Sequence, residues 1–257
     1  MASQSPSTSS RSRFVPAFRN QASGPTCDDE PMGTLIPAAT VILGRDGGAD
    51  IEVLMLRRDS RLAFAGGMWV FPGGRLDPED FGDTPDDQAA AEQRAAAREA
   101  GEECGLSVDV NGMHRWSHWT PPDMGQDHRF STAFFVGQAP SGDITIDDGE
   151  IRDFTWATPV GAMERHRAGE IELAPPTFIT LCQLSVVASV AELLDLADTS
   201  APEHFTTQIA RTGPDRADMV ALYHGDIAYD DHDKVSESGP HHRLVMQPDG
   251  WRYVRDA

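Results

Sequence analysis

Apolar and polar positions change their spacing several times along the chain, and each change marks a predicted element. The β-branched runs 34–44 and 51–58 have the composition of strands, and the Gly-Gly pair between them is typical of a hairpin turn. An alanine-rich run begins at Asp86 or Asp87 and ends at Gly105, which predicts a long helix. Further strands are expected at 117–120, 130–138 and 150–158.

The second half of the chain contains fewer predicted elements than the first. Residues 175–198 begin with two prolines and continue as an apolar run, which predicts a second long helix. Alternation of apolar and polar residues from 218 onward predicts a small β-hairpin. Strands that surround two helices are typical of an α/β or α+β fold. We therefore expect a disordered tail at 1–32, a main domain at 33–170 and a C-terminal helix and hairpin extension at 171–257, packed on the main domain.

Charge and composition exclude several classes of protein. The chain has 41 acidic against 21 basic residues and a formal net charge of −20, so a general nucleic-acid binder is not expected. A small anionic substrate held by a local arginine cluster remains compatible with that balance. The 3 cysteines are scattered, which argues against a disulfide framework or a structural zinc site. No apolar run reaches the ~18 residues of a membrane span, so a cytoplasmic protein without membrane contact is expected.

An acidic cluster lies near the end of the first predicted helix. Glu99, Glu102 and Glu103 have the spacing that brings side chains to one helix face. Like charges so arranged destabilise a helix by a few tenths of a kcal/mol per pair (~0.2–0.5). Arg98 can pair with Glu102, but one arginine does not balance three carboxylates, whereas a hard divalent cation does. The alternative is a solvated helix with several glutamates. The Gly73-Gly74 turn favours the cation, because glycine lets backbone carbonyls approach a metal closely.

Two segments, "FPGGR" at 71–75 and "REAGEECGL" at 98–106, together resemble the signature of the Nudix hydrolases. Gly74 matches the first residue of the signature, and Arg98 begins its second half. This chain carries an insertion between the two halves, and Ala100 occupies an aliphatic position. The isolated glutamate of the signature has three candidate counterparts, which are Glu79, Asp80 and Glu92.

The resemblance implies a Nudix fold, in which a mixed β-sheet lies between α-helices, over roughly residues 34–160. It also implies an enzyme in which Mg²⁺ or Mn²⁺ activates water to cleave the diphosphate of a nucleotide derivative. The implied metal ligands are the carboxylates of Glu99, Glu102 and Glu103 and the carbonyl of Gly73 or Gly74. Glu99 is also implied as a catalytic base that Arg98 orients. Glu150, in a later loop, is the candidate for a further acidic residue of the catalytic site, with an ordinary acidic residue of a surface turn as the alternative.

A second pattern concerns the substrate. Leu54, Arg58, Gly67 and the segment 71–74 match the spacing of a motif of Nudix coenzyme A diphosphatases, and the insertion resembles the peroxisomal-type branch and its bacterial relatives. Arg61 lies two positions before the second arginine of that motif. This resemblance implies coenzyme A or an acyl-coenzyme A as the substrate, with Arg58 and Arg61 on its 3′-phosphate and Arg129 in a similar role. The alternative for Arg58 and Arg61 is that they are ordinary arginines at the end of an edge strand.

Several alternatives stay open at the level of sequence. One alternative keeps the same reaction and changes the substrate to ADP-ribose, NADH or a dinucleoside polyphosphate. The other alternative is a different class of protein, a non-catalytic Nudix-fold regulator that binds a nucleotide. The intact set of acidic residues favours the enzyme. The apolar helix at 177–197 is expected to form core or a homodimer surface rather than an acyl groove.

Overall fold

The computed structural model describes residues 33–48, 50–62, 65–146, 149–213 and 218–256, so the predicted N-terminal tail lies outside the described residues. The main part of the chain contains the strands β1 (Thr34–Asp46), β2 (Ile51–Arg58), β3 (Trp69–Val70), β4 (Gly73–Arg75), β5 (Met113–Thr120), β6 (His128–Gln138), β7 (Ile151–Ala157) and β8 (Glu203–Thr206). Its helices are η1 (Pro78–Phe81), α1 (Gln88–Cys104), η2 (Val110–Gly112), α2 (Pro159–Arg167), α3 (Pro175–Leu184) and α4 (Val190–Thr199). None of the described helices is long and apolar enough to cross a membrane.

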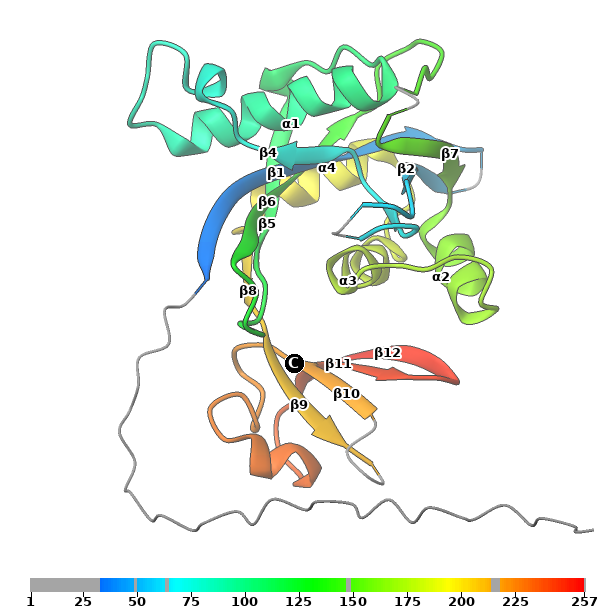
Figure 1. The fold of residues 1–257 in the computed structure, drawn as a ribbon. Coiled ribbons are helices and arrows are strands. Elements are labelled where there is room, and N and C mark those ends of the chain that lie inside the picture. Colours follow the sequence, from blue (N-terminus) through cyan, green and yellow to red (C-terminus); the bar gives the residue numbers. More distant parts are fainter. Residues whose placement is uncertain (1–32, 49, 63–64, 147–148, 214–217, 257) are drawn as a thin grey trace, which may run out of the picture. The chain divides into compact units, whose positions relative to one another are not determined.

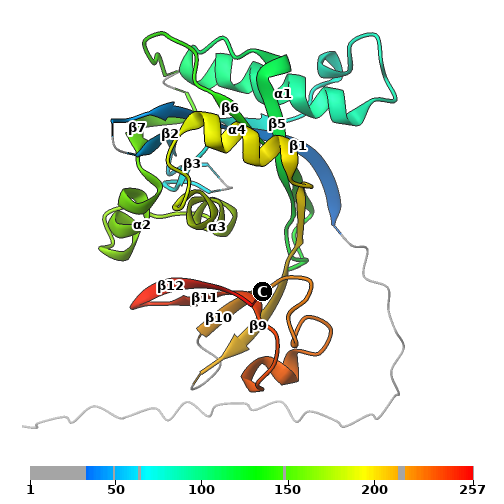
Figure 2. The same ribbon diagram turned by 180° about the vertical axis from the view of Figure 1, so that it is seen from behind.

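The strands β1 to β8 form one mixed sheet with helices on both faces (Figures 1 and 2). Its central strands follow the order β3-β2-β1-β6-β5-β8, in which β1 and β6 are parallel and β1 and β2 are antiparallel. Alternate residues of β2 serve opposite faces: Leu54 and Leu56 pack with the alanines of α1, and Val53 and Met55 pack with α3 and α4. The expected mixed sheet between helices is confirmed, and the period-2 alternation of the strands explains it.

The Gly73-Gly74 turn is held in place because its residues form the short strand β4. This strand pairs antiparallel with β1, so that Gly73 lies opposite Thr40 and Gly74 opposite Ala39. The next residues form η1, whose Asp77 and Asp80 make a reciprocal capping box. The chain then enters α1, so the glycine turn and the acidic end of α1 lie side by side on one face of the sheet (Figure 1).

The prediction of one long helix at 175–198 is wrong. The structure has two helices there, α3 and α4, separated by residues 185–189. The Ser185 hydroxyl donates to the carbonyl of Cys182, and Ser189 caps α4 by accepting from the amide of Glu192. Asp46, far away in sequence, accepts from the amide of Val190 at 2.9 Å. Local serine hydrogen bonds and this distant carboxylate together favour a new helix over continuation of the first.

The C-terminal segment forms more than the predicted hairpin. The strands β9 (Gln208–Thr212), β10 (Asp218–Leu222), β11 (His242–Gln247) and β12 (Gly250–Arg255) make a four-stranded antiparallel sheet among the described residues, and η4 (His232–Ser236) lies between β10 and β11. Phe205, Tyr223 and Leu244 belong to the same buried cluster as the core of the main sheet. The aromatic ring of Phe205 stacks on that of Trp119 with ring centres 3.9 Å apart.

Candidate functional site

A cavity of about 620 Å³ opens between the glycine turn, the end of α1 and the adjoining strands, within the ~300–1,000 Å³ of typical small-molecule sites. The predicted site residues that line it are Arg58, Gly74, Arg98, Glu99, Glu102, Glu103 and Glu150. Asp77, Thr40 and Thr132 also line the cavity and were missed at the level of sequence. No local signal marks the two threonines, because sheet pairing alone brings β1 and β6 to this place.

Helix α1 presents the carboxylates because its opposite face is made of small residues. Ala95, Ala96 and Ala100 are fully buried against the sheet, which lets the helix lie close to it. The helix is capped by Asp87, whose side chain accepts from the amide of Ala90, and it ends at Gly105 with a left-handed φ of 72°. Both predicted ends are confirmed, and they place the glutamates in the last turns, beside β4.

Glu103 is the most buried carboxylate that lines the cavity, with 5% of its surface exposed. One carboxylate oxygen accepts from the amide of Gly73 at 2.9 Å, and the other lies 3.8 Å from an Arg58 nitrogen. Burial raises the pKa of Glu103 to about 8, and the nearby charge of Glu99 acts in the same direction. The hydrogen bond from Gly73 and the charge of Arg58 oppose this shift without cancelling it.

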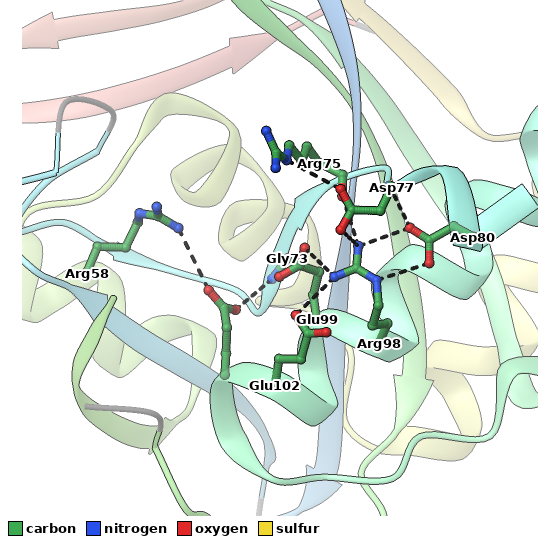
Figure 3. A network of polar contacts seen from close by, with 9 residues as sticks. Arg58, Gly73, Arg75, Asp77, Asp80, Arg98, Glu99 and Glu102 are labelled. Atoms are coloured by element: carbon green, nitrogen blue, oxygen red, sulfur yellow. Dashed lines mark hydrogen bonds and ion pairs between the residues drawn. The ribbon is translucent and has the colours of Figure 1, made fainter. Parts of the chain in front are cut away.

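Arg98 organises the other two glutamates (Figure 3). One of its terminal nitrogens donates to Glu99 at 2.9 Å and to Glu102 at 3.0 Å. The other side of the guanidinium donates to the two carboxylate oxygens of Asp80 at 3.1 and 3.0 Å. Burial raises the pKa of Glu99, and Arg98 moderates that rise. Glu102 keeps 61% of its side chain exposed, so it faces the open side of the cavity.

The structure distinguishes the three candidates for the isolated acidic residue of the signature. Asp80 is 4% exposed and holds Arg98 through two hydrogen bonds. Glu92 instead forms an ion pair with Arg115, and Glu79 is exposed. The insertion before α1 therefore supplies an aspartate, from η1, as the partner of Arg98. Sequence spacing alone does not reveal this, because the choice depends on how η1 folds back on the helix.

Arg58 and Glu150 meet at the edge of the cavity although they are far apart in sequence. A terminal nitrogen of Arg58, at the end of β2, donates to a carboxylate oxygen of Glu150 at 2.9 Å. Within the described chain, the buried Nε of Arg58 has no hydrogen-bond acceptor. A buried donor without a partner is costly to the folded state.

The other two predicted arginines lie away from this cavity. The side chain of Arg61 is 78% exposed and is bound to Asp59 through its amide and guanidinium nitrogens. Arg129 is buried and donates to the backbone carbonyls of Pro121 and Gly33, at 3.1 and 3.3 Å. Neither is among the residues that line the cavity.

The donor set of the cavity suits a hard divalent cation. Glu99, Glu102 and Glu103 supply carboxylate oxygens, and the cavity wall beside them contains the backbone of Gly73 and Gly74. In the described parts of the chain, no group of three acidic, histidine or cysteine side chains is arranged to hold a metal ion. Arg98 donates hydrogen bonds to Glu99 and Glu102, and the amide of Gly73 donates one to Glu103. A Cβ on Gly74 would lie 2.4 Å from a carboxylate oxygen of Glu99, so only glycine leaves that carboxylate in place.

We expect Gly74→Ala to weaken divalent-cation binding about 10- to 100-fold, which is typical of disturbing the surroundings of a metal ligand. The added methyl group displaces the end of the Glu99 side chain, which is flexible, so the melting temperature stays nearly unchanged. Calorimetric titration with Mn²⁺ measures the affinity, and a thermal scan measures the fold.

Gly73→Ala is the matched comparison. Its Cβ would lie 2.4 Å from the carbonyl oxygen of Ala39 and 2.7 Å from Cα of Thr40, which are backbone atoms. This variant should lose roughly 1–3 kcal/mol of stability, since overpacked backbone cannot relax as a side chain does. Equal cation affinity in Gly74→Ala and the unmodified protein would remove Glu99 from the cation site.

Comparisons with known proteins agree with this geometry. A family model described as "NUDIX domain" matches residues 34–175. The acyl-coenzyme A diphosphatase NUDT19 of Gallus gallus is 30% identical over 246 residues, which cover 86% of this chain and 60% of that protein. NUDT19 of Xenopus laevis is 34% identical over 89 residues, covering 33% of this chain and 23% of that protein. The chain thus spans about three fifths, at most, of the length of these two relatives. The crystal structure of a NUDIX hydrolase from Alicyclobacillus acidocaldarius superposes with a TM-score of 0.58 at 25% identity, covering 64% of this chain and 97% of that chain.

Proposed function

The chain belongs to the Nudix family, and from this we propose that it is a hydrolase that cleaves a diphosphate bond with the help of a bound divalent cation. The observation that carries the proposal is the cavity in which three glutamates of α1 face the Gly73-Gly74 turn. A site for binding alone does not need three carboxylates beside a glycine cradle. Their presence supports the enzyme over the non-catalytic regulator.

Mg²⁺ or Mn²⁺ is the proposed cofactor, held by Glu99, Glu102, Glu103 and the carbonyl of Gly74. When bound, such a cation neutralises the charge of a diphosphate and lowers the pKa of a water ligand. Arg98 orients Glu99 and Glu102 from one side, and its guanidinium is itself fixed by Asp80. Asp80 is therefore a positioning residue, and Glu99 is the proposed base.

Glu150 is the proposed second proton acceptor. Arg58 donates to the Glu150 carboxylate at 2.9 Å, and both residues line the cavity. A second acidic residue at the cavity supports the proposal, because it gives a proton from water an acceptor besides Glu99.

Coenzyme A or an acyl-coenzyme A is the proposed substrate. The printed activity of NUDT19, an acyl-coenzyme A diphosphatase, supports it, as does the motif that includes Arg58 and the segment 71–74. Water would add to one phosphorus and the bridging P–O bond would break. From coenzyme A the products are adenosine 3′,5′-bisphosphate and 4′-phosphopantetheine, with the protons of the water released.

Incubation of the protein with coenzyme A, dephospho-coenzyme A, ADP-ribose and NADH, followed by identification of the products, tests this proposal. Because the guanidinium of Arg58 lines the cavity, coenzyme A should exceed dephospho-coenzyme A in kcat/KM by about tenfold to a hundredfold, from roughly 1.5–3 kcal/mol per charged hydrogen bond. Arg58→Ala should reduce this ratio towards one, even if it also slows both substrates.

Arg61→Ala is the matched control, since it removes a neighbouring arginine that is bound to Asp59 outside the cavity. It should keep the preference for coenzyme A. Faster cleavage of ADP-ribose or NADH than of coenzyme A would sink the substrate assignment and leave the diphosphatase standing. Binding of these nucleotides without any cleavage would favour the regulator.

A further inference from the structure

A second, apolar pocket of about 140 Å³ adjoins the carboxylate cavity. Five residues line both spaces, which makes them continuous: Thr40, Arg58, Gly73, Phe130 and Thr132. Any group that occupies the pocket therefore begins beside the place proposed for the diphosphate.

Rings form the inner wall of the pocket, and their packing fixes its shape. Phe71 and Phe134 meet edge to face with ring centres 6.4 Å apart, and Trp119 lies 6.0 Å from Phe134. Trp119 is in turn stacked on Phe205 of β8. The wall is thus held from behind by buried aromatic contacts, and the pocket is formed before a ligand binds.

The outer wall comes from segments after the main strands. Ala174 and Thr177 stand at the start of α3, and Thr207 lies between β8 and β9. The amide of Thr207 donates to the carbonyl of Thr120 at 2.9 Å, which fixes that segment against the end of β5. Residues beyond the predicted main domain therefore complete the pocket.

The chemistry of the lining limits what the pocket can hold. Arg58 is the single charged side chain among its described lining residues, and no amide or carboxylate side chain is present. The other polar side-chain groups of the described lining residues are threonine hydroxyls and the indole N–H of Trp119, which donates to Ser117. A purine edge needs paired donors and acceptors, and a lining of rings, methyl groups and hydroxyls does not supply them. A compact aliphatic group that carries a hydroxyl fits this lining.

We infer that this pocket binds the branched aliphatic end of the pantetheine arm of coenzyme A, an assignment that rests on the proposed function. In coenzyme A the diphosphate carries adenosine on one side. On the other side it carries a methylene, then a carbon with two methyl groups, then a hydroxyl-bearing carbon. This is the first apolar group next to the phosphates, whereas an acyl chain is attached at the far end of the arm. The pocket volume of about 140 Å³, against about 620 Å³ for the carboxylate cavity, suits this small group better than a nucleoside.

The two halves of coenzyme A provide the test, because each one contains a phosphate and only one contains the arm. Binding of 4′-phosphopantetheine and of adenosine 3′,5′-bisphosphate is measured by calorimetry for the unmodified protein, Ala174→Leu and Thr207→Leu. The two variants enlarge side chains on different elements of the outer wall, so that one remains informative if the other fails to fold. Ala168→Leu is the matched control, since Ala168 is exposed at the end of α2 and outside the pocket.

We expect the leucine variants to weaken 4′-phosphopantetheine binding by about tenfold or more and adenosine 3′,5′-bisphosphate binding by less than about twofold, as for blocking a small apolar subsite. Ala168→Leu should change neither. A loss confined to the bisphosphate would place adenosine in the pocket and overturn the inference. Unchanged binding, or an equal loss for both halves, would overturn it as well. Because binding is measured without turnover, failure of the unmodified protein to hydrolyse coenzyme A would count against the proposed function separately.

Discussion

Glu103→Gln is expected to lower kcat by roughly three orders of magnitude or more, because it removes a charged group from the proposed cation site, where the cation would activate water and neutralise the diphosphate. The variant should fold normally. The side-chain oxygen of glutamine can still accept the hydrogen bond that the Gly73 amide donates to Glu103 at 2.9 Å. Burial already favours the neutral form of Glu103, and an amide has nearly the same shape, so the melting temperature should stay nearly unchanged.

Single-turnover and steady-state rates on coenzyme A, with a thermal scan of each protein, measure this effect. Glu79→Gln is the matched control, since Glu79 is an exposed glutamate of the neighbouring η1 and lies outside the cavity. It should keep full activity. A Glu103→Gln protein with near-normal turnover and an unchanged dependence on the cation would remove Glu103 from the site.

The carboxylate cluster was predictable because its geometry is local. Three glutamates at helical spacing, a capping aspartate and a C-terminal glycine define one face and both ends of α1 without reference to any other element. The strands β1 and β2 were also predictable locally, because each is a short apolar, β-branched run that borders a glycine turn, and each is buried over four consecutive residues. Glu150 was found through a resemblance, and its contact with Arg58 joins residues 92 positions apart.

What was missed depends on contacts between distant segments. The break between α3 and α4 involves Asp46, a residue of β1, which no window around 185–189 contains. Arg61 and Arg129, which the sequence predicts to hold a phosphate, contact Asp59 and two backbone carbonyls, and neither lines the cavity. The sequence could not distinguish Asp80 from Glu79 and Glu92 as the acidic partner of Arg98, because the choice depends on how the inserted segment folds back toward Arg98. Charge and residue type indicate candidate residues, and the fold determines which of them lie at the site.

The divalent cation carries the largest expected effect. Burial raises the pKa of Glu103 to about 8 and also raises the pKa of Glu99, so the charged form of each carboxylate is costly in this cavity. A bound dication would stabilise the charged forms through the same oxygens. Without this cation, neither the orientation of the water nor the charge of the phosphates would be provided for, so the rate of hydrolysis should fall by several orders of magnitude.

Turnover of coenzyme A after removal and return of the cation is the most direct test of the proposed chemistry. The protein is stripped with EDTA, freed of chelator, and assayed alone, with Mg²⁺ or Mn²⁺, and with Na⁺ at matched ionic strength. The account predicts no measurable release of adenosine 3′,5′-bisphosphate from the stripped protein or with Na⁺, and recovery with a divalent cation. Full turnover by the stripped protein would contradict it.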